Sequence, residues 1–202
     1  NNTLKRKFIT NNIIGLGLLT AIVLVMQFIS MGLRFGTFSI TLTLIPIVVG
    51  SALYGWGSGA WLGFVFGVTV LLTGDANLFL AVNIPGTIIT VILKGAFAGA
   101  AAGFVYKLIS KKNQIAAVIV SAVVAPVVNT GIFVLGSYVF FFDYLSGLAE
   151  GTNLFVFILV GLVGINFFIE LGINLVLNPA ILQIIRIGKK NFGGKNQIIK
   201  TK

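Results

Sequence analysis

The chain has 202 residues, of which 57% are hydrophobic and only 9% are charged, and its mean hydropathy is +1.08. Soluble domains carry roughly 25% charged residues, so this composition excludes a soluble enzyme and predicts an integral membrane protein. The formal net charge is +10. The basic residues cluster beside hydrophobic runs, where anionic lipid and membrane topology explain them better than nucleic acid does.

The side chains that most enzymes use are scarce. The sequence has no Cys and no His, which removes thiolate nucleophiles, imidazole bases and the usual zinc ligands. Its acids are Asp75, Asp143, Glu150 and Glu170, too few and too scattered for a metal site or a hydrolytic pair. We therefore expect no catalytic residue, no metal and no cofactor.

Six hydrophobic runs predict an all-α membrane protein with about six transmembrane helices in one domain, 1–202. The runs lie near residues 12–30, 39–54, 58–73, 86–107, 114–140 and 154–184. A span needs about 20 apolar residues, so the second and third runs have to use interfacial residues or cross where the fold is thin. The first run lacks a small-residue cleavage pattern, and we expect it to be a retained helix.

Positive charge gathers at the ends of the chain and in one loop. Basic residues fill the short ends, about 1–10 and 186–202, and Lys107, Lys111 and Lys112 lie between the fourth and fifth runs. With six spans these groups share one side, which the positive-inside rule makes the cytoplasm. We expect a multi-pass protein of a prokaryotic plasma membrane with both termini cytoplasmic, and we expect the external loops near 31–38, 74–85 and 141–153 to mark the functional end.

Small residues recur at four-residue spacing, which places each set on one helix face. The sets are Gly17 and Ala21 in the first run, Gly55, Gly59, Gly63 and Gly67 in the third, and Gly95, Gly99 and Gly103 in the fourth. A face without side chains lets two helices approach closely in lipid. We therefore predict packing within the chain for the two glycine stripes, and either packing or a partner helix for the pair in the first run.

Lys94 lies well inside the fourth run. A lysine at the centre of a span costs about 2.5–3.5 kcal/mol, so such a residue faces a cavity, a partner charge or a bound anion. Glu170 is the other ionisable residue deep inside a run. Lys94 is therefore predicted either to contact a ligand or to form a structural ion pair with Glu170.

The sixth run carries a polar stripe of Asn166, Glu170, Asn174 and Asn178 at four-residue spacing, which has to point inward. Helical rise brings Lys94 nearer in depth to Asn166 than to Glu170. Asn166 is therefore the better ligand candidate. We expect Asn174 and Asn178 to hold helices together near the cytoplasmic end.

Two further segments supply neutral hydrogen-bonding groups. Pro126 is followed by Asn129 and Thr130, and a proline break with nearby amides is typical of a cavity wall. Asn83, in the loop before the fourth run, can reach a ligand from outside. The predicted substrate-binding residues are Lys94, Asn129, Thr130, Asn166, Glu170 and Asn83.

Taken together, the six short-looped helices, the basic ends, the segment from Thr41–Ile47 to Gly67 and the ending Glu170–Asn174–Pro179 resemble the substrate-binding S components of energy-coupling-factor (ECF) vitamin transporters. The resemblance implies capture of a vitamin from outside, near the outer half of the helices. It also implies a transmembrane coupling subunit (T component) and two cytoplasmic ATPase subunits as partners, with Gly17 and Ala21 facing the coupling subunit. The chain has no phosphate-binding Gly-x-x-x-x-Gly-Lys-Ser/Thr motif of its own.

Within this family the pattern is most similar to the pantothenate-type members, in which an arginine often precedes the glycine of the fourth helix. Here Lys94 stands in that place, and its point charge is compatible with any anionic vitamin. Two alternatives stay open: an S component for another vitamin or precursor, and a self-sufficient secondary transporter or small channel that uses Lys94 and Glu170. An inverted repeat would favour the second, but only Pro46 and Pro126 correspond between the two halves.

Overall fold

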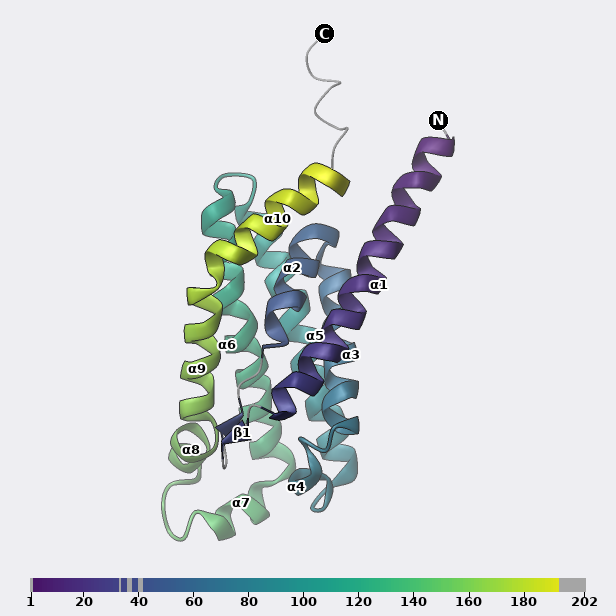
Figure 1. Cartoon of the computed structure of the whole chain (residues 1–202). Helices are drawn as coiled ribbons and strands as arrows, with labels where there is room; N and C mark the ends of the chain where they lie inside the picture. Colours follow the sequence, from purple (N-terminus) through teal and green to yellow (C-terminus); the bar gives the residue numbers. More distant parts are fainter. Residues whose placement is uncertain (1, 33, 36–37, 40–41, 193–202) are drawn as a thin grey trace.

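The computed structural model describes residues 2–32, 34–35, 38–39 and 42–192, with side chains described for 12–32 and 42–190. Its helices run mostly along one common direction, and α1 leans away from the others toward its start (Figure 1). The elements in chain order are α1 (Asn2–Gly32), β1 (Arg34–Phe35), β2 (Phe38–Ser39), α2 (Leu44–Tyr54), α3 (Trp56–Leu72), α4 (Asn77–Leu80), α5 (Ile84–Ile109), α6 (Gln114–Phe140), α7 (Phe142–Leu148), α8 (Leu154–Val156), the π-helix η1 (Phe157–Gly164), α9 (Ile165–Val176) and α10 (Asn178–Phe192). The two short strands pair antiparallel.

Four helical segments of the described chain are long and apolar enough to cross a membrane. They are Asn12–Gly32, Ile84–Ile109, Gln114–Phe140 and Leu154–Val176, while α2 and α3 are apolar but shorter. The chain is therefore a multi-pass membrane protein, as its composition predicts. Whether α2 and α3 complete six spans, and on which side the termini lie, stay predictions.

The sixth predicted run, 154–184, ends earlier than expected. Helix α9 stops at Val176, and α10 begins at Asn178 as a separate helix that crosses the end of the bundle (Figure 1). Pro179 accounts for the break, because proline lacks an N–H and fits only the first turn of a new helix. The predicted break at Pro126 is also wrong, since α6 continues through that residue.

Glycines hold α3 against α5, as their spacing predicts. A Cβ on Gly63 would collide with the carbonyl oxygen of Gly95, and a Cβ on Gly59 with that of Gly99. Gly67 approaches the carbonyl oxygen of Val91 in the same way, at 2.8 Å from the position of a Cβ. The close contact of the two backbones confirms the predicted packing.

Gly55 does not belong to this contact face. Its φ is 96°, and a Cβ there would meet nothing within 4 Å. A positive φ favours glycine, so Gly55 instead forms the tight turn between α2 and α3.

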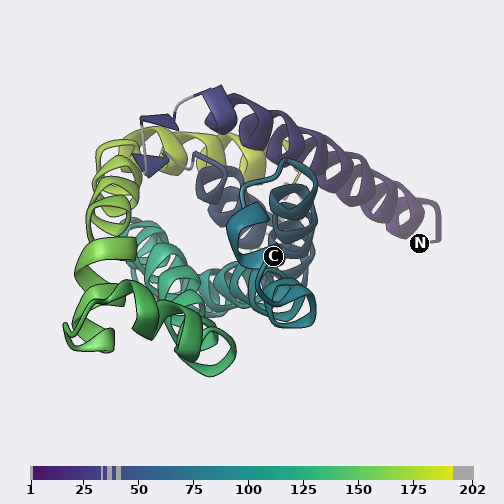
Figure 2. The same ribbon diagram turned by 90° about the horizontal axis from the view of Figure 1, so that it is seen from below.

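Helix α2 occupies the middle of the bundle, as the view along the helices shows (Figure 2). Eight of its residues are buried. It packs with α1, α3, α5, α6 and α10, and its Val48, Val49 and Ala52 share a hydrophobic cluster with Tyr106 of α5 and Ile185 of α10. Because α2 has only 11 residues, it fills the centre at the end where α10 lies and leaves the other half to different side chains.

Candidate functional site

A cavity of about 490 Å³ lies in the half of the bundle that α2 does not fill. It is lined by α1, the second half of α3, the segment 74–79 after α3, the first half of α5, the second half of α6, η1 and α9. Small-molecule sites in proteins measure roughly 300–1,000 Å³, so the cavity is large enough for a vitamin-sized ligand. Its polar lining residues are Gln27, Asp75, Thr87, Thr90, Lys94, Asn129, Thr130, Asn166 and Glu170.

Lys94 is the cationic side chain of the cavity wall. Its Nζ lies 5.2 Å from the ring centroid of Phe133 and 5.9 Å from that of Phe66, so two aromatic faces flank the ammonium group. Contacts of this kind stabilise a cation by about 0.5–2 kcal/mol. The chain thus places a partly exposed lysine between two aromatic rings on the wall of the cavity.

Glu170, on α9, brings a negative charge to the same cavity. Its side chain is 7% exposed, and its carboxylate attracts the Lys94 ammonium electrostatically. A ligand anion and Glu170 would therefore compete for the same cation. This arrangement is compatible with both predicted roles of Lys94, contact with a ligand and an ion pair with Glu170.

Five of the six predicted substrate-binding residues line this single cavity. They come from three helices: Lys94 from α5, Asn129 and Thr130 from α6, and Asn166 and Glu170 from α9. Asn129 is 6% exposed, and its Oδ1 is buried without a hydrogen-bond partner among the described residues. That any of the five binds a substrate stays a prediction.

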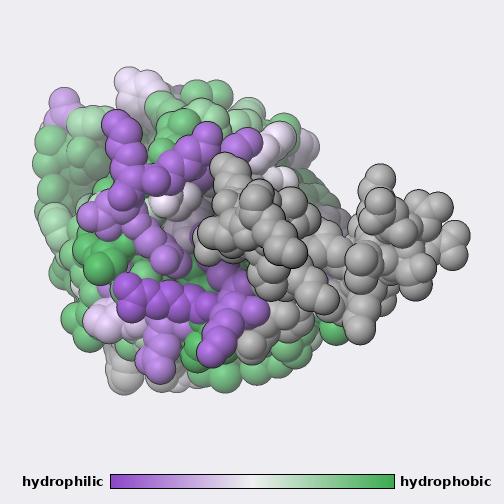
Figure 3. All heavy atoms as spheres, turned by 90° about the horizontal axis from the view of Figure 1, so that it is seen from above, coloured by the Kyte–Doolittle hydropathy of each residue, from purple (hydrophilic) through white to green (hydrophobic). Residues whose placement is uncertain are grey.

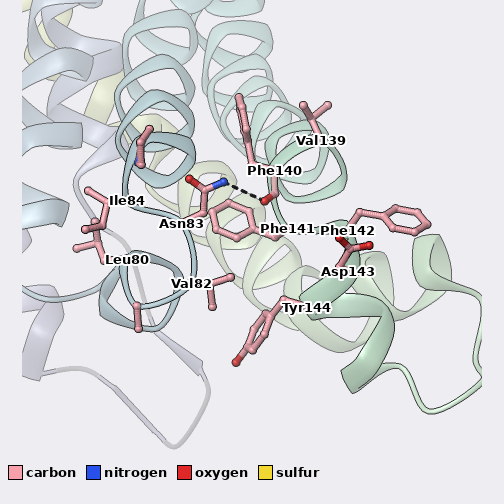
Figure 4. Close-up of a pocket in the computed structure, with 12 residues that line it drawn as sticks. Leu80, Val82, Asn83, Ile84, Val139, Phe140, Phe141, Phe142, Asp143 and Tyr144 are labelled. Carbon is pink, nitrogen blue, oxygen red and sulfur yellow. Dashed lines mark hydrogen bonds between the residues drawn. The ribbon is translucent and has the colours of Figure 1, made fainter.

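Asn83 lies elsewhere. Its Oδ1 accepts a hydrogen bond from the Gly86 backbone N–H at 2.9 Å and caps the start of α5, and its Nδ2 donates to the Phe140 carbonyl oxygen at 3.2 Å (Figure 4). It lines a second depression of about 530 Å³ between the α4–α5 and α6–α7 connections. The structure therefore separates Asn83 from the other five residues.

Of the stripe on α9 and α10, the two asparagines that were expected to hold helices together line neither cavity. Asn174 is 1% exposed, and its Nδ2 donates to the Glu170 carbonyl oxygen at 2.9 Å within its own helix. Asn178 is 7% exposed at the start of α10. Their burial agrees with a structural role.

A hydrogen-bonded network at one end of the cavity is absent from the sequence prediction. Gln27 of α1 donates through Nε2 to Asp75 Oδ2, and Thr43 Oγ1 donates to Gln27 Oε1 at 3.1 Å. Gln27 is 2% exposed. The network ties α1 to the start of α2 and to the loop after α3. The sequence signal for this network is the amide side chain of Gln27, which lies within a largely apolar run.

Aromatic side chains close the wall next to this network. Phe79 meets Phe133 edge to face at 5.5 Å between ring centroids, and it meets Phe141 at 5.0 Å. Phe141 lines both the central cavity and the second depression. Phe141 is therefore shared by the two spaces, and we expect its ring to separate them.

The wall opposite α5 contains the π-helix η1, whose Leu162 and Val163 line the cavity just before Asn166. Segments of π-helix occur frequently at functional sites because they alter which side chains face inward. The uniformly apolar sequence of Phe157–Gly164 does not predict this π-helix.

The small pair of α1 points away from the bundle. Gly17 and Ala21 are exposed, and a Cβ on Gly17 would meet nothing within 4 Å. Packing against the described parts of the chain therefore does not account for this pair. The alternative, a partner helix, stays a prediction.

Comparison with known proteins identifies the family of the chain. Residues 11–182 match the family described as "ECF transporter, substrate-specific component". The structure of ThiT from Listeria monocytogenes is similar, with a TM-score of 0.63 and 22% sequence identity over 95% of this chain and 99% of that one. Among curated protein sequences, none matches. The family match extends over most of the chain, and the chain belongs to the substrate-specific components of ECF transporters.

Proposed function

We propose that the chain is the membrane-embedded, substrate-binding subunit of an ATP-driven ECF importer and that it binds a vitamin carboxylate, pantothenate in particular, in the central cavity. The observation that carries the proposal is the position of Lys94 on the wall of a cavity of vitamin size. An intramembrane cation is costly unless it meets an anion or a polar cavity. A bound carboxylate would supply that anion.

The neighbours of Lys94 support a ligand of mixed character. Asn129, Thr130 and Asn166 offer amide and hydroxyl groups, which suit a ligand with hydroxyl and amide groups beside its carboxylate. Phe66 and Phe133 offer apolar contact area. Pantothenate combines these three features, whereas a simple inorganic anion lacks two of them.

We further propose six spans with both termini cytoplasmic. Under the positive-inside rule, the end that carries Lys107, Lys111, Lys112 and α10 then faces the cytoplasm. The cavity lies in the other half, toward the outside, where an importer has to collect its substrate. A T component would dock on the exposed Gly17–Ala21 face, and two ATPase subunits would supply the energy.

A ligand screen tests the substrate. The purified chain is heated with pantothenate, biotin, riboflavin or thiamine, and the melting temperature is measured. A ligand at 100 times its Kd stabilises the folded state by about 2.7 kcal/mol. We expect pantothenate to raise Tm, and a response to a different vitamin alone would reassign the substrate within the same site.

A transport assay tests the dependence on partners. The chain is reconstituted into liposomes alone, or together with the T component and ATPases, and uptake of labelled pantothenate is followed with and without ATP. We expect uptake only in the complete assembly with ATP. Uptake by the chain alone would instead support the alternative of a self-sufficient secondary transporter or channel.

A further inference from the structure

The last helix, α10, is fixed to the bundle by one of its faces. Ile181 and Ile185 are both 0% exposed, and α10 packs against α2 and α6. Gly188 allows close contact on the same face, because a Cβ there would lie 2.9 Å from the methyl carbons of Leu53. The position of α10 across the end of the bundle is therefore set by buried contacts.

A second face of α10 is apolar and exposed. Ala180, Ile184 and Ile187 follow each other at spacings of four and three residues, which aligns them along one side of the helix, and Leu177 precedes them at the junction of α9 and α10. Leu177, Ile184 and Ile187 are 38%, 49% and 51% exposed. Covering side chains of this type with an apolar phase lowers the free energy of the system. This flank continues the exposed apolar surface of α9, where Val176 is 77% exposed.

The third face is basic. Arg186, Lys189 and Lys190 are exposed there, and Lys189 Nζ lies 4.8 Å from the ring centroid of Tyr106 in the last turn of α5. That contact joins the basic face to the neighbouring α5–α6 turn. The resulting basic patch consists of Lys107, Lys111, Lys112, Arg186, Lys189 and Lys190. Figure 3 shows hydrophilic side chains gathered across this end of the molecule, with hydrophobic ones around them.

No acid of the described chain balances the basic patch. Asp75 and Glu150 lie in loops and Asp143 lies in α7, all at the opposite end, and Glu170 lines the central cavity. The patch is therefore open to an external anion. Because its apolar flank adjoins the exposed apolar surface of α9, a ligand at the boundary between headgroups and acyl chains would cover both at once.

We propose that α10 lies in the plane of the membrane surface and that the basic patch binds the phosphate groups of anionic phospholipids. Its isoleucine flank contacts acyl chains while its lysines and arginine reach the headgroups. The occupant is a lipid rather than free phosphate, because both faces have to be covered at once. This surface is separate from the vitamin site, so either can exist without the other.

Thermal unfolding of the full chain in detergent tests the proposal. We expect added phosphatidylglycerol, at about 100 times its Kd, to raise Tm by about 5–10 °C. Phosphatidylcholine or inorganic phosphate should leave Tm unchanged. The variant with Arg186→Gln, Lys189→Gln and Lys190→Gln should lose most of this shift. A matched variant with the three basic residues of 5–7 changed to Gln should keep it.

An equal response to both lipids, or a full response in the α10 variant, would overturn the proposal. A response to inorganic phosphate alone would identify a free-anion site instead. If the α10 variant kept its lipid response but no longer assembled with cytoplasmic subunits, the basic patch would be a protein interface.

Depth measurements provide a second test that does not depend on removing charge. The chain has no cysteine, so a single cysteine at Ile184, Ile187, Gln183 or Lys190 carries a spin label without background. In liposomes of phosphatidylcholine and phosphatidylglycerol, we expect collisions with oxygen relative to a nickel chelate to be several-fold higher at Ile184 and Ile187. Equal ratios at all four positions would show that α10 does not lie in the membrane surface.

Discussion

Replacing Lys94 by methionine removes the charge from the cavity while keeping a side chain of similar length. Hydrogen bonds to charged groups contribute about 1.5–3 kcal/mol. Since 1.4 kcal/mol corresponds to a factor of ten in affinity, the Kd for pantothenate should rise roughly 10- to 150-fold. Isothermal titration calorimetry of the purified chain measures this directly. The neutral alcohol analogue of pantothenate is the control ligand, because its affinity should hardly change.

Glu170 makes a second measurement necessary. It is buried and lines the same cavity as Lys94, and if the two form an ion pair, removal of one partner costs up to about 3–5 kcal/mol of stability. The Lys94→Met chain without ligand should therefore melt at a lower temperature than the wild type. Adding Glu170→Gln should restore Tm, because no uncompensated charge remains, but it should not restore the affinity.

The double variant separates the two roles of Lys94. If Lys94 were only a structural partner of Glu170, the Lys94→Met, Glu170→Gln chain would bind pantothenate with wild-type affinity. That result would refute the assignment of Lys94 as a ligand contact. Unchanged affinity in Lys94→Met alone would do the same.

Three further predictions follow from the packing. Gly63→Ala should lower stability by about 1–3 kcal/mol in thermal unfolding because its Cβ meets the α5 backbone, whereas Gly131→Ala, where a Cβ meets nothing within 4 Å, should not. Gly17→Leu should abolish transport by the complete assembly without altering the Kd for the vitamin. Unchanged transport would show that the Gly17–Ala21 face does not contact the T component. Phe141→Ala should join the central cavity to the second depression and speed ligand association and dissociation in stopped-flow experiments. Phe142 lines only the second depression, so Phe142→Ala should leave both rates unaltered.

The sequence was most informative where a residue has few tolerable environments. Four-residue glycine spacing predicted the α3–α5 contact because no other feature needs bare helix faces in lipid. Lys94 and the polar residues of the fifth and sixth runs predicted an interior cavity because each is costly in hydrocarbon. Gly55 shows the limit: the same residue type at the same spacing serves a turn with φ 96°, and spacing alone does not distinguish the two uses.

Hydropathy was least informative where apolar residues continue across a change of structure. The run 154–184 reads as one span because apolar residues predominate both before Leu177 and after Pro179, although Asn178 and Pro179 mark the start of a new helix. The aromatic partition was equally hidden, since Phe79 and Phe141 are two of 18 phenylalanines. Asn83 was assigned to the ligand, but an asparagine immediately before a helix with an early proline also fits a cap, and this is the use that the structure gives it.

The short second helix and the intramembrane lysine are two consequences of one arrangement. With 11 residues, α2 extends about 17 Å at 1.5 Å per residue, roughly half of the 30 Å hydrocarbon thickness. The centre of the bundle is therefore filled with apolar side chains over half of its depth. In the remaining half, Lys94, Asn129 and Asn166 line a cavity instead of meeting lipid. If the helix α2 continued through the other half of the bundle, its side chains would occupy that space, and the polar groups would lose the solute or water that compensates the cost of placing them there.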